Sequence, residues 1–192
     1  MIVEIESKCD WIQELDNSLY VDARFHKIIC FYVINTPVTE LSSRAIDLKK
    51  HGWNRPWNKK YYLNKQLKEQ STNPKLMYSA KTYANIDEAL EKAALKDNFP
   101  FDCSYERIVV YNKKENQFIS TFYHIRNSLA HGRFSIKVEE ESNDWIFIFE
   151  DVVYNKKKRK YKLSARMILK LSTLLAWINL IENGEIEYSK TQ

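Results

Sequence analysis

The chain has 192 residues, of which 44% are hydrophobic and 29% are charged, and its formal net charge is +5 at pH 7. This length suffices for one sizeable domain, and the three cysteines, which show no paired spacing, argue against a disulfide framework or a zinc site. With only three glycines and four prolines, the composition disfavours a loop-rich barrel or sandwich and favours helices.

The distribution of hydrophobic residues is typical of a soluble protein. No segment reaches eighteen consecutive apolar residues, and the first six residues contain neither a basic region nor a long apolar run. We therefore expect a cytoplasmic protein that forms a single domain over 1–192, with 185–192 as a polar tail. The positive net charge has the sign that suits a nucleic-acid partner.

Apolar residues at helical spacing predict a series of helices in the first half of the chain. The predicted ranges are 9–20, 21–34, 39–51, 63–70, 75–83, 86–96 and 101–111. The pattern is strongest in 21–34, where Phe25, Ile29 and Val33 share one face. The range 101–111 also fits a strand, and we favour a helix there because it directly precedes another helix.

The segment Trp53–Tyr62 interleaves aromatic and basic residues. Such a composition occurs where single-stranded RNA stacks on rings beside a cationic track. It occurs equally where tryptophans anchor a loop on the core while nearby lysines are solvated. The sequence leaves both interpretations open.

The segment 117–132 combines core periodicity with reactive side chains. Its apolar residues Phe118, Phe122, Ile125 and Leu129 fall on one stripe of a helix, and Gly132 is a typical stop residue. His131 is then in the last turn, where the helix dipole favours a cation.

Three polar residues of this helix can border one shallow site. Arg126 and His131 are roughly 140° apart around the helix axis and roughly 7.5 Å apart along it. Asn127 and His131, four residues apart, share a face. In a purely structural interpretation, these residues only form hydrogen bonds with the last free carbonyl groups of the helix. His124 lies outside this group, and we interpret it as a structural or interface residue.

The spacing Arg-Asn-x-x-x-His, formed by Arg126, Asn127 and His131, resembles the signature of the HEPN superfamily. In that signature the Arg and the His are separated by four to six residues, and a polar residue follows the Arg. The run Ala130–Phe134, which leads into a predicted strand, is also similar to the family. The resemblance implies a metal-independent endoribonuclease without a cofactor, in which motif helices of two protomers form one composite cleft at a two-fold axis.

RNA cleavage without a metal needs a base for the 2′-hydroxyl proton, an acid for the leaving 5′-oxygen and a cation for the phosphorane. His131 suits the first or second role, and the partner's His131 could supply the other. The planar guanidinium of Arg126 matches two phosphate oxygens, and Asn127 can orient the scissile group. DNA, which lacks the 2′-hydroxyl, should not be cut.

After Gly132 the apolar period changes from 3.6 to 2, which predicts a β-hairpin from 134–138 and 145–149. Ser164 is then predicted to cap a long closing helix over 165–183, apolar on more than one face. Between them lies a basic run that either holds an RNA backbone or forms a solvated turn. The candidate RNA contacts are Arg133, Lys156, Lys157, Lys158, Arg159 and Lys160.

These observations together predict a mainly α protein, a HEPN-like helical bundle with a β-hairpin between the motif helix and the C-terminal helix. We expect a homodimeric endoribonuclease that binds RNA. Resemblance alone suggests a toxin or antiphage-defence effector with an antitoxin or defence partner. The alternatives are a non-catalytic RNA- or nucleotide-binding or scaffolding protein, and an accessory or antitoxin subunit.

Overall fold

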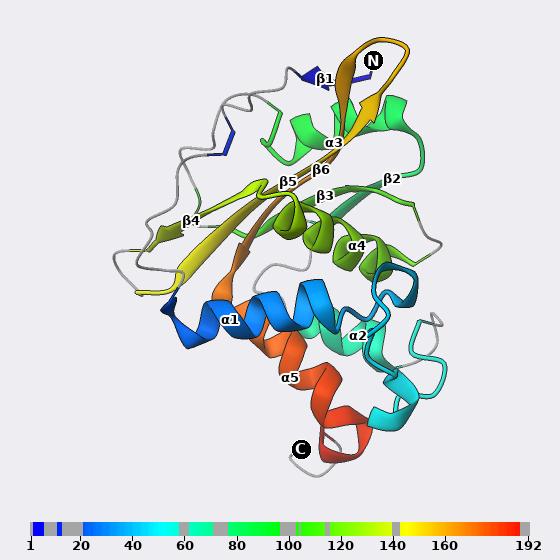
Figure 1. Ribbon diagram of the computed structural model, residues 1–192, viewed down its shortest axis with the longest axis vertical. Helices are drawn as coiled ribbons and strands as arrows, with labels where there is room; N and C mark the ends of the chain where they lie inside the picture. Colours follow the sequence, from blue (N-terminus) through cyan, green and yellow to red (C-terminus); the bar gives the residue numbers. More distant parts are fainter. Residues whose placement is uncertain are drawn as a thin grey trace.

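The protein has an α/β fold built on a six-stranded mixed sheet in the order β2-β3-β6-β5-β4, with β1 pairing to β6 (Figure 1). The computed structural model describes residues 2–5, 11–12, 21–57, 62–70, 77–96, 103, 105–113, 116–139 and 143–188. The predicted mainly α bundle with one inserted hairpin is therefore wrong, because strands from both halves of the chain assemble into one sheet.

The strands are β1 (Glu4–Ile5), β2 (Met77–Ala80), β3 (Arg107–Tyr111), β4 (Phe134–Val138), β5 (Trp145–Asn155) and β6 (Lys160–Lys170). The α-helices are α1 (Ala23–Ile29), α2 (Tyr62–Glu69), α3 (Ile86–Lys92), α4 (Gln117–Ala130) and α5 (Leu171–Tyr188). A π-helical segment at Cys30–Ile34 extends α1, and shorter 3₁₀ turns lie at Thr39–Leu41, Leu48–His51 and Tyr83–Asn85.

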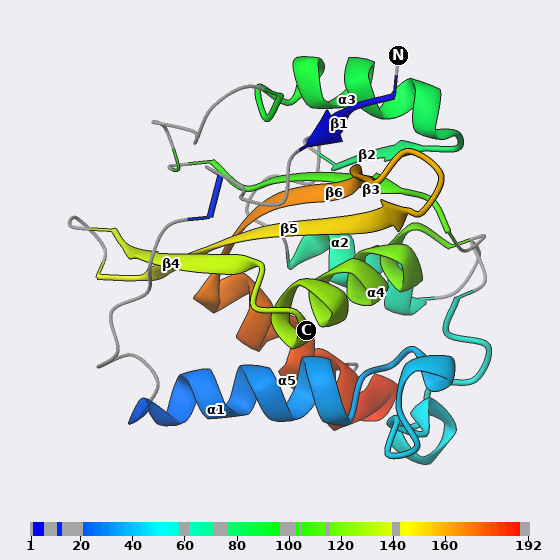
Figure 2. The same cartoon turned by 45° about the horizontal axis from the view of Figure 1, so that its top comes forward.

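The sheet is covered on both faces. Figure 2 shows α3 on one side of the sheet and α4, α5 and α1 on the other. Side chains alternate between the two cores along β5, so that Phe147 and Phe149 pack on the α4 side while Ile146 and Ile148 pack on the α3 side. This strand is consequently apolar at successive positions.

Burial on both faces explains part of the error in the predicted secondary structure. Residues 77–80 and 107–111 form β2 and β3 instead of helices, and the closing helix begins at Leu171 because 160–170 form β6. A strand apolar on both faces resembles a buried helix in sequence, since its period of two is hidden. The range 39–51 forms only two 3₁₀ turns.

Other predicted elements are confirmed. The ranges 21–34, 63–70 and 86–96 contain α1 with its π-helical extension, α2 and α3, and the predicted hairpin is β4 and the first half of β5. Most of the predicted helix 9–20 lies outside the described residues. Within the described part of the chain, every helix is too short or too polar to cross a bilayer.

The segment around Trp53 fixes the end of α5. The buried indole of Trp53 donates a hydrogen bond to the Ile181 carbonyl oxygen at 3.0 Å, and Nδ1 of His51 is 2.6 Å from the Glu182 carbonyl oxygen. These carbonyls belong to the end of the regular helix, where intrahelical donors run out. The structure therefore supports the anchoring interpretation of Trp53. Lys59 and Lys60 lie outside the described residues.

Candidate functional site

The predicted apolar stripe packs the motif helix α4 against the hydrophobic core. Phe118, Phe122, Ile125 and Leu129 are all buried in the core beneath the sheet. At the start of the helix, the Asn116 side chain accepts hydrogen bonds from the backbone N–H groups of residues 118 and 119 at 2.8 and 3.2 Å, a typical N-cap. Both ends of α4 are thus fixed independently of the polar motif.

The C-terminal end of α4 is a Schellman motif. Gly132 has φ 63°, its N–H donates to the Leu129 carbonyl at 3.2 Å, and the Arg133 N–H donates to the Ser128 carbonyl at 2.8 Å. The predicted stop at Gly132 is confirmed. His131 is the exposed C-cap residue, and its imidazole forms no hydrogen bond with the described residues.

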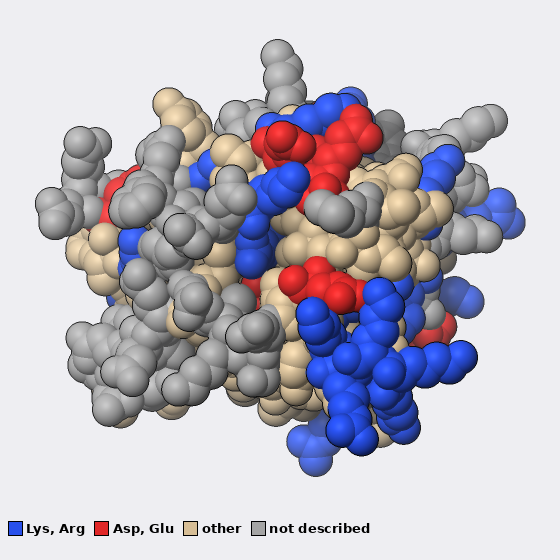
Figure 3. All heavy atoms as spheres, turned by 90° about the horizontal axis from the view of Figure 1, so that it is seen from above, with Lys and Arg blue, Asp and Glu red and all other residues tan. Residues whose placement is uncertain are grey.

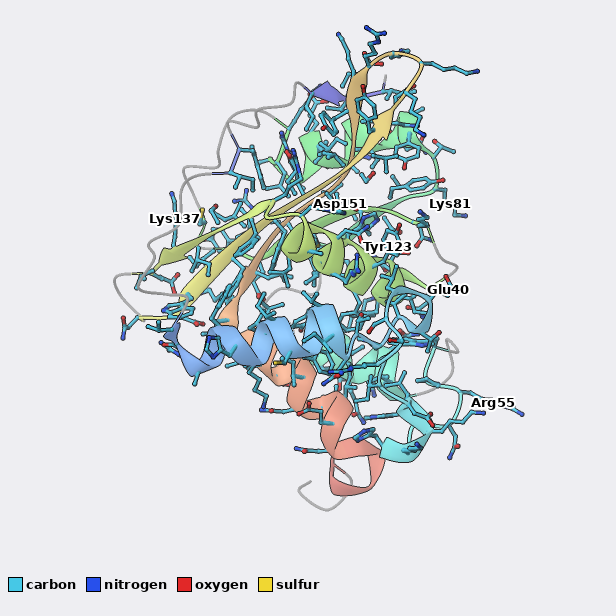
Figure 4. The ribbon with its side chains drawn as sticks, viewed as in Figure 1. Glu40, Arg55, Lys81, Tyr123, Lys137 and Asp151 are labelled. Carbon is cyan, nitrogen blue, oxygen red and sulfur yellow. The ribbon has the colours of Figure 1, made fainter. Side chains whose placement is uncertain are left out.

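Arg126 and Asn127 are joined to a buried pair that the sequence analysis missed. Arg126 Nη1 donates to Asn127 Oδ1 at 3.3 Å, and Asn127 Nδ2 donates to Asp151 Oδ2 at 3.4 Å. The same carboxylate oxygen lies 2.6 Å from Nδ1 of His124. Figure 4 labels Asp151 on the strand above α4 and Tyr123 on α4 itself. The motif is thereby connected to β5.

His124 serves as a structural residue, as the sequence analysis expects. Its Nε2 is 2.8 Å from the Tyr111 carbonyl oxygen, which can only accept a hydrogen bond. The Asp151 carboxylate at Nδ1 is likewise an acceptor, so an imidazole that carries a proton on each nitrogen satisfies both partners. The side chains of His124 and Asp151 are only 1% and 3% exposed. This is a buried ion pair.

One sequence signal could have indicated Asp151. Glu150 and Asp151 directly follow the apolar run Trp145–Phe149 of β5 and are both buried. Charged residues inside an otherwise apolar strand need partners when they are buried. The sequence does not indicate which residues these partners are.

Glu150 holds a second buried ion pair, which involves Arg133. The Glu150 side chain is 0% exposed, pairs with the 17% exposed side chain of Arg133, and also accepts from Arg166 Nε at 3.0 Å. Arg166 Nη1 in turn donates to the carbonyls of Leu95 and Lys96 at 2.8 and 2.7 Å. Arg133, a candidate RNA contact, is thus partly engaged in an internal network.

The predicted basic run forms the exposed turn between β5 and β6. Figure 3 shows a dense group of Lys and Arg side chains at the corner where this hairpin projects. Glu4 neutralises part of the turn, since Lys158 and Lys160 lie 2.6 and 3.8 Å from its carboxylate. The hydrogen bond from Lys158 is the main cause of the lowered pKa of Glu4.

The turn lies along the same hairpin as the motif network. From Asp151 to Asn155, β5 rises by about 13 Å at its usual rise per residue. The turn therefore begins about 13 Å along β5 from the carboxylate that contacts Asn127. Within the described ranges, no group of three or more His, Cys, Asp or Glu side chains is placed to hold a metal ion.

A comparison with known protein families identifies the family of this chain. Residues 35–187 match the family described as HEPN pEK499 p136, a range that contains α4 with its motif and the β5–β6 hairpin. Comparisons with curated proteins and with solved structures found no match. Because the matched range covers more than three quarters of the chain, this protein belongs to the HEPN family.

Proposed function

We propose that the protein is a metal-independent endoribonuclease and that Arg126, Asn127 and His131 form its catalytic site. The observation that carries this proposal is the exposed imidazole of His131 at the end of α4, which forms no hydrogen bond with the part of the chain that the structure describes. One turn before it, Asn127 is held by Asp151 and contacts Arg126. Membership in a HEPN family supports the same class of activity.

In the proposed reaction, the 2′-oxygen of a ribose attacks the adjacent phosphorus while a base takes the 2′-hydroxyl proton. The bond from phosphorus to the 5′-oxygen breaks, and an acid protonates that oxygen. The products are a 2′,3′-cyclic phosphate and a 5′-hydroxyl. Arg126 stabilises the negative charge on the phosphorane with its fork of donors, and Asn127 orients the scissile phosphate.

We propose that two copies of the chain form the active unit. The reaction needs a base and an acid, and one protomer offers a single exposed histidine at this site. The other histidine on α4, His124, is buried and engaged at both ring nitrogens. The partner subunit's His131 would supply the missing group across a two-fold axis. Activity per chain should then fall on dilution, as species of twice the 22.9 kDa chain mass dissociate.

The basic turn is the proposed contact for the RNA backbone. Its five consecutive positive charges, at 156–160, equal the net charge of +5 of the whole chain. Such a concentration favours a polyanionic partner through counterion release. Arg133, whose side chain is 17% exposed beside Glu150, is proposed as a further contact. A toxin or defence role remains compatible with this chemistry.

The test is cleavage of a fluorescent single-stranded RNA by the full chain in EDTA. His131→Ala should lower the rate by about 10²–10⁴, the usual contribution of a general acid or base. His26→Ala is the matched control, because His26 is also an exposed histidine near a helix end, and it should cut at the wild-type rate. A substrate with one 2′-deoxyribose at the cleaved position should resist cleavage, because it lacks the attacking 2′-hydroxyl.

Two results would overturn the nuclease proposal. One is wild-type cleavage by His131→Ala. The other is a wild-type protein that binds RNA but does not cut it in EDTA, which would instead support a non-catalytic RNA-binding HEPN protein.

A further inference from the structure

Two lysines near the proposed cleavage site are ordered by tyrosines instead of carboxylates. Lys113 Nζ donates to the Tyr123 hydroxyl at 2.8 Å and lies 4.7 Å from the centroid of that ring. Lys162 Nζ lies 3.2 Å from the ring centroid of Tyr83, a cation–π contact. Neither ammonium forms an ion pair with a carboxylate of the described residues. Among the described residues, both ammonium groups are therefore held in place by neutral tyrosines and not by a paired carboxylate.

Two exposed lysines elsewhere in the structure, Lys65 and Lys92, have carboxylate partners. Lys92 lies 2.6 Å from Glu88, and Lys65 lies 3.6 Å from Glu69, each one helical turn away. Such pairs neutralise both charges locally and contribute little to stability. The environment of Lys113 and Lys162 differs because aromatic rings, which carry no net charge, hold the ammonium groups.

The tyrosines and lysines form one group around the end of β3. We call this group the tyrosine–lysine surface, and it comprises Tyr83, Tyr111, Tyr123, Lys113 and Lys162. Tyr83 stacks on Tyr111 with 4.0 Å between ring centroids, and Tyr123 packs edge-on against His124 at 5.2 Å. Lys81 follows β2 beside this group, since Ala80 pairs with Tyr111, and Figure 4 shows Lys81 and Tyr123 on the same side of the molecule.

The tyrosine–lysine surface connects the basic turn to the motif. Lys162 lies on β6 two residues after the turn, which ends at Lys160. At the other end, Tyr123 is one helical turn before Asn127 and two before His131, so the three residues form a row on α4 with steps of about 6 Å. Positive side chains thus continue from the hairpin tip to the row that carries the catalytic candidates.

The electrostatics of the surface suit an anion. Burial, followed by repulsion from Lys158, lowers the pKa of Lys162, as expected for a cation that lacks a negative partner. The hydrogen bond to Tyr123 raises the pKa of Lys113. Burial raises the pKa of Tyr83, so its hydroxyl stays neutral at physiological pH. An incoming phosphate would supply the charge that the lysines lack.

We propose that the tyrosine–lysine surface binds phosphates of single-stranded RNA between the basic turn and His131. This inference rests on the proposed nuclease function and names the path by which its substrate reaches the site. The lysines contact phosphate oxygens, and the tyrosine rings hold the lysines in place. Because ammonium groups already cover the faces of Tyr83 and Tyr123, the rings order cations instead of stacking on bases.

The experiment measures the salt dependence of RNA binding. A fluorescein-labelled 2′-O-methyl RNA strand, which cannot be cleaved through its 2′-oxygen, is titrated with the full chain at several salt concentrations, and binding is followed by anisotropy. The double variant Lys113→Met/Lys162→Met should bind more weakly. The slope of log K against log salt should fall in magnitude by about 1.4, because each phosphate contact on a single strand contributes about 0.7.

Two control variants separate the contribution of the tyrosine–lysine surface to RNA binding from that of the total charge of the chain. Lys65→Met/Lys92→Met removes the same charge from lysines already paired with glutamates, and it should leave the slope unchanged. Lys113→Arg/Lys162→Arg keeps both cations and should retain the wild-type slope. Thermal unfolding of each variant verifies that it is folded under the binding conditions.

A wild-type slope in the folded Met double variant would overturn the proposal, as would an equal loss of slope in the Lys65→Met/Lys92→Met control. The result is distinct from the test of the nuclease, because binding of the 2′-O-methyl strand needs no cleavage. A reduced slope in a protein that never cuts RNA would support the surface and reject the nuclease. Cleavage that depends on His131, together with an unchanged slope in the Met double variant, would support the nuclease and reject the tyrosine–lysine surface.

Discussion

The ion pair between His124 and Asp151 should be a major determinant of stability, and Asp151→Ala tests it. In the wild type, both side chains are almost fully buried, and Nδ1 of His124 lies 2.6 Å from the carboxylate. Removing the carboxylate leaves that nitrogen without an acceptor and also deprives Asn127 of its contact at 3.4 Å. The alanine offers neither group a replacement.

The free energy of unfolding that Asp151→Ala loses follows from these two lost interactions. A hydrogen bond to a charged group contributes about 1.5–3 kcal/mol, and an ordinary one about 0.5–1.5 kcal/mol, so the expected loss is about 2–4.5 kcal/mol. Breaking a buried ion pair by removing one partner costs about 3–5 kcal/mol in other proteins. We expect about 3 kcal/mol, a large share of a typical domain stability of about 5–15 kcal/mol.

Urea denaturation of the full chain, followed by tryptophan fluorescence, gives the free energy of unfolding by linear extrapolation. The variants Asp151→Ala and His124→Ala and their double variant form a double-mutant cycle, for which we expect a coupling energy of at least about 1.5 kcal/mol. The exposed pair Glu88 and Lys92, treated in the same way, should give a coupling energy close to zero, because solvent screens both charges. A coupling energy at His124 and Asp151 no larger than this control would refute the assignment of a buried ion pair.

Three further substitutions test backbone and capping contacts, each by the shift in its urea midpoint. Gly184→Ala should destabilise by about 3 kcal/mol or more, because the new Cβ would lie 2.0 Å from the His51 carbonyl oxygen and φ 78° with ψ 177° is a conformation open essentially to glycine alone. Gly132→Ala should cost only about 1–2 kcal/mol, since φ is 63° but nothing lies within 4 Å of the added Cβ. An equal loss of stability in the two glycine variants would contradict the expected clash between the Cβ at position 184 and the His51 carbonyl oxygen. Trp53→Phe should cost about 1–3 kcal/mol by leaving the Ile181 carbonyl without its indole donor, whereas an unchanged midpoint would show that water replaces the indole.

Local patterns predicted the motif helix and its surroundings correctly. The stripe of Phe118, Phe122, Ile125 and Leu129 is buried as expected, and Gly132 ends the helix in a left-handed conformation. Both features depend on side-chain spacing and backbone sterics within a few residues, which a single sequence displays directly. The same holds for the β4–β5 hairpin, where one residue in two is polar in β4.

Strands buried on both faces could not be predicted in this way. At the end of β6, Met167 and Leu169 pack toward α4 while Ile168 packs toward α3, so residues 167–169 show no polar alternation and also fit a helix. Only the register with β3 and β5 distinguishes the two possibilities. The inferred bundle was wrong because that pairing depends on residues far apart in the chain.

The amino-acid sequence by itself determined the motif helix, its stop at Gly132 and the family to which Arg126, Asn127 and His131 point, because each depends on the spacing of neighbouring residues. Only the tertiary structure decided that Asp151 reaches His124 and Asn127, that Glu150 joins Arg133 to Arg166, and that Lys113 and Lys162 lie beside tyrosines at the end of β3. These contacts depend on sheet register and on how α4 crosses β5. A buried charge requires a partner, but its identity is set by which strands pair, and that is a property of the whole fold.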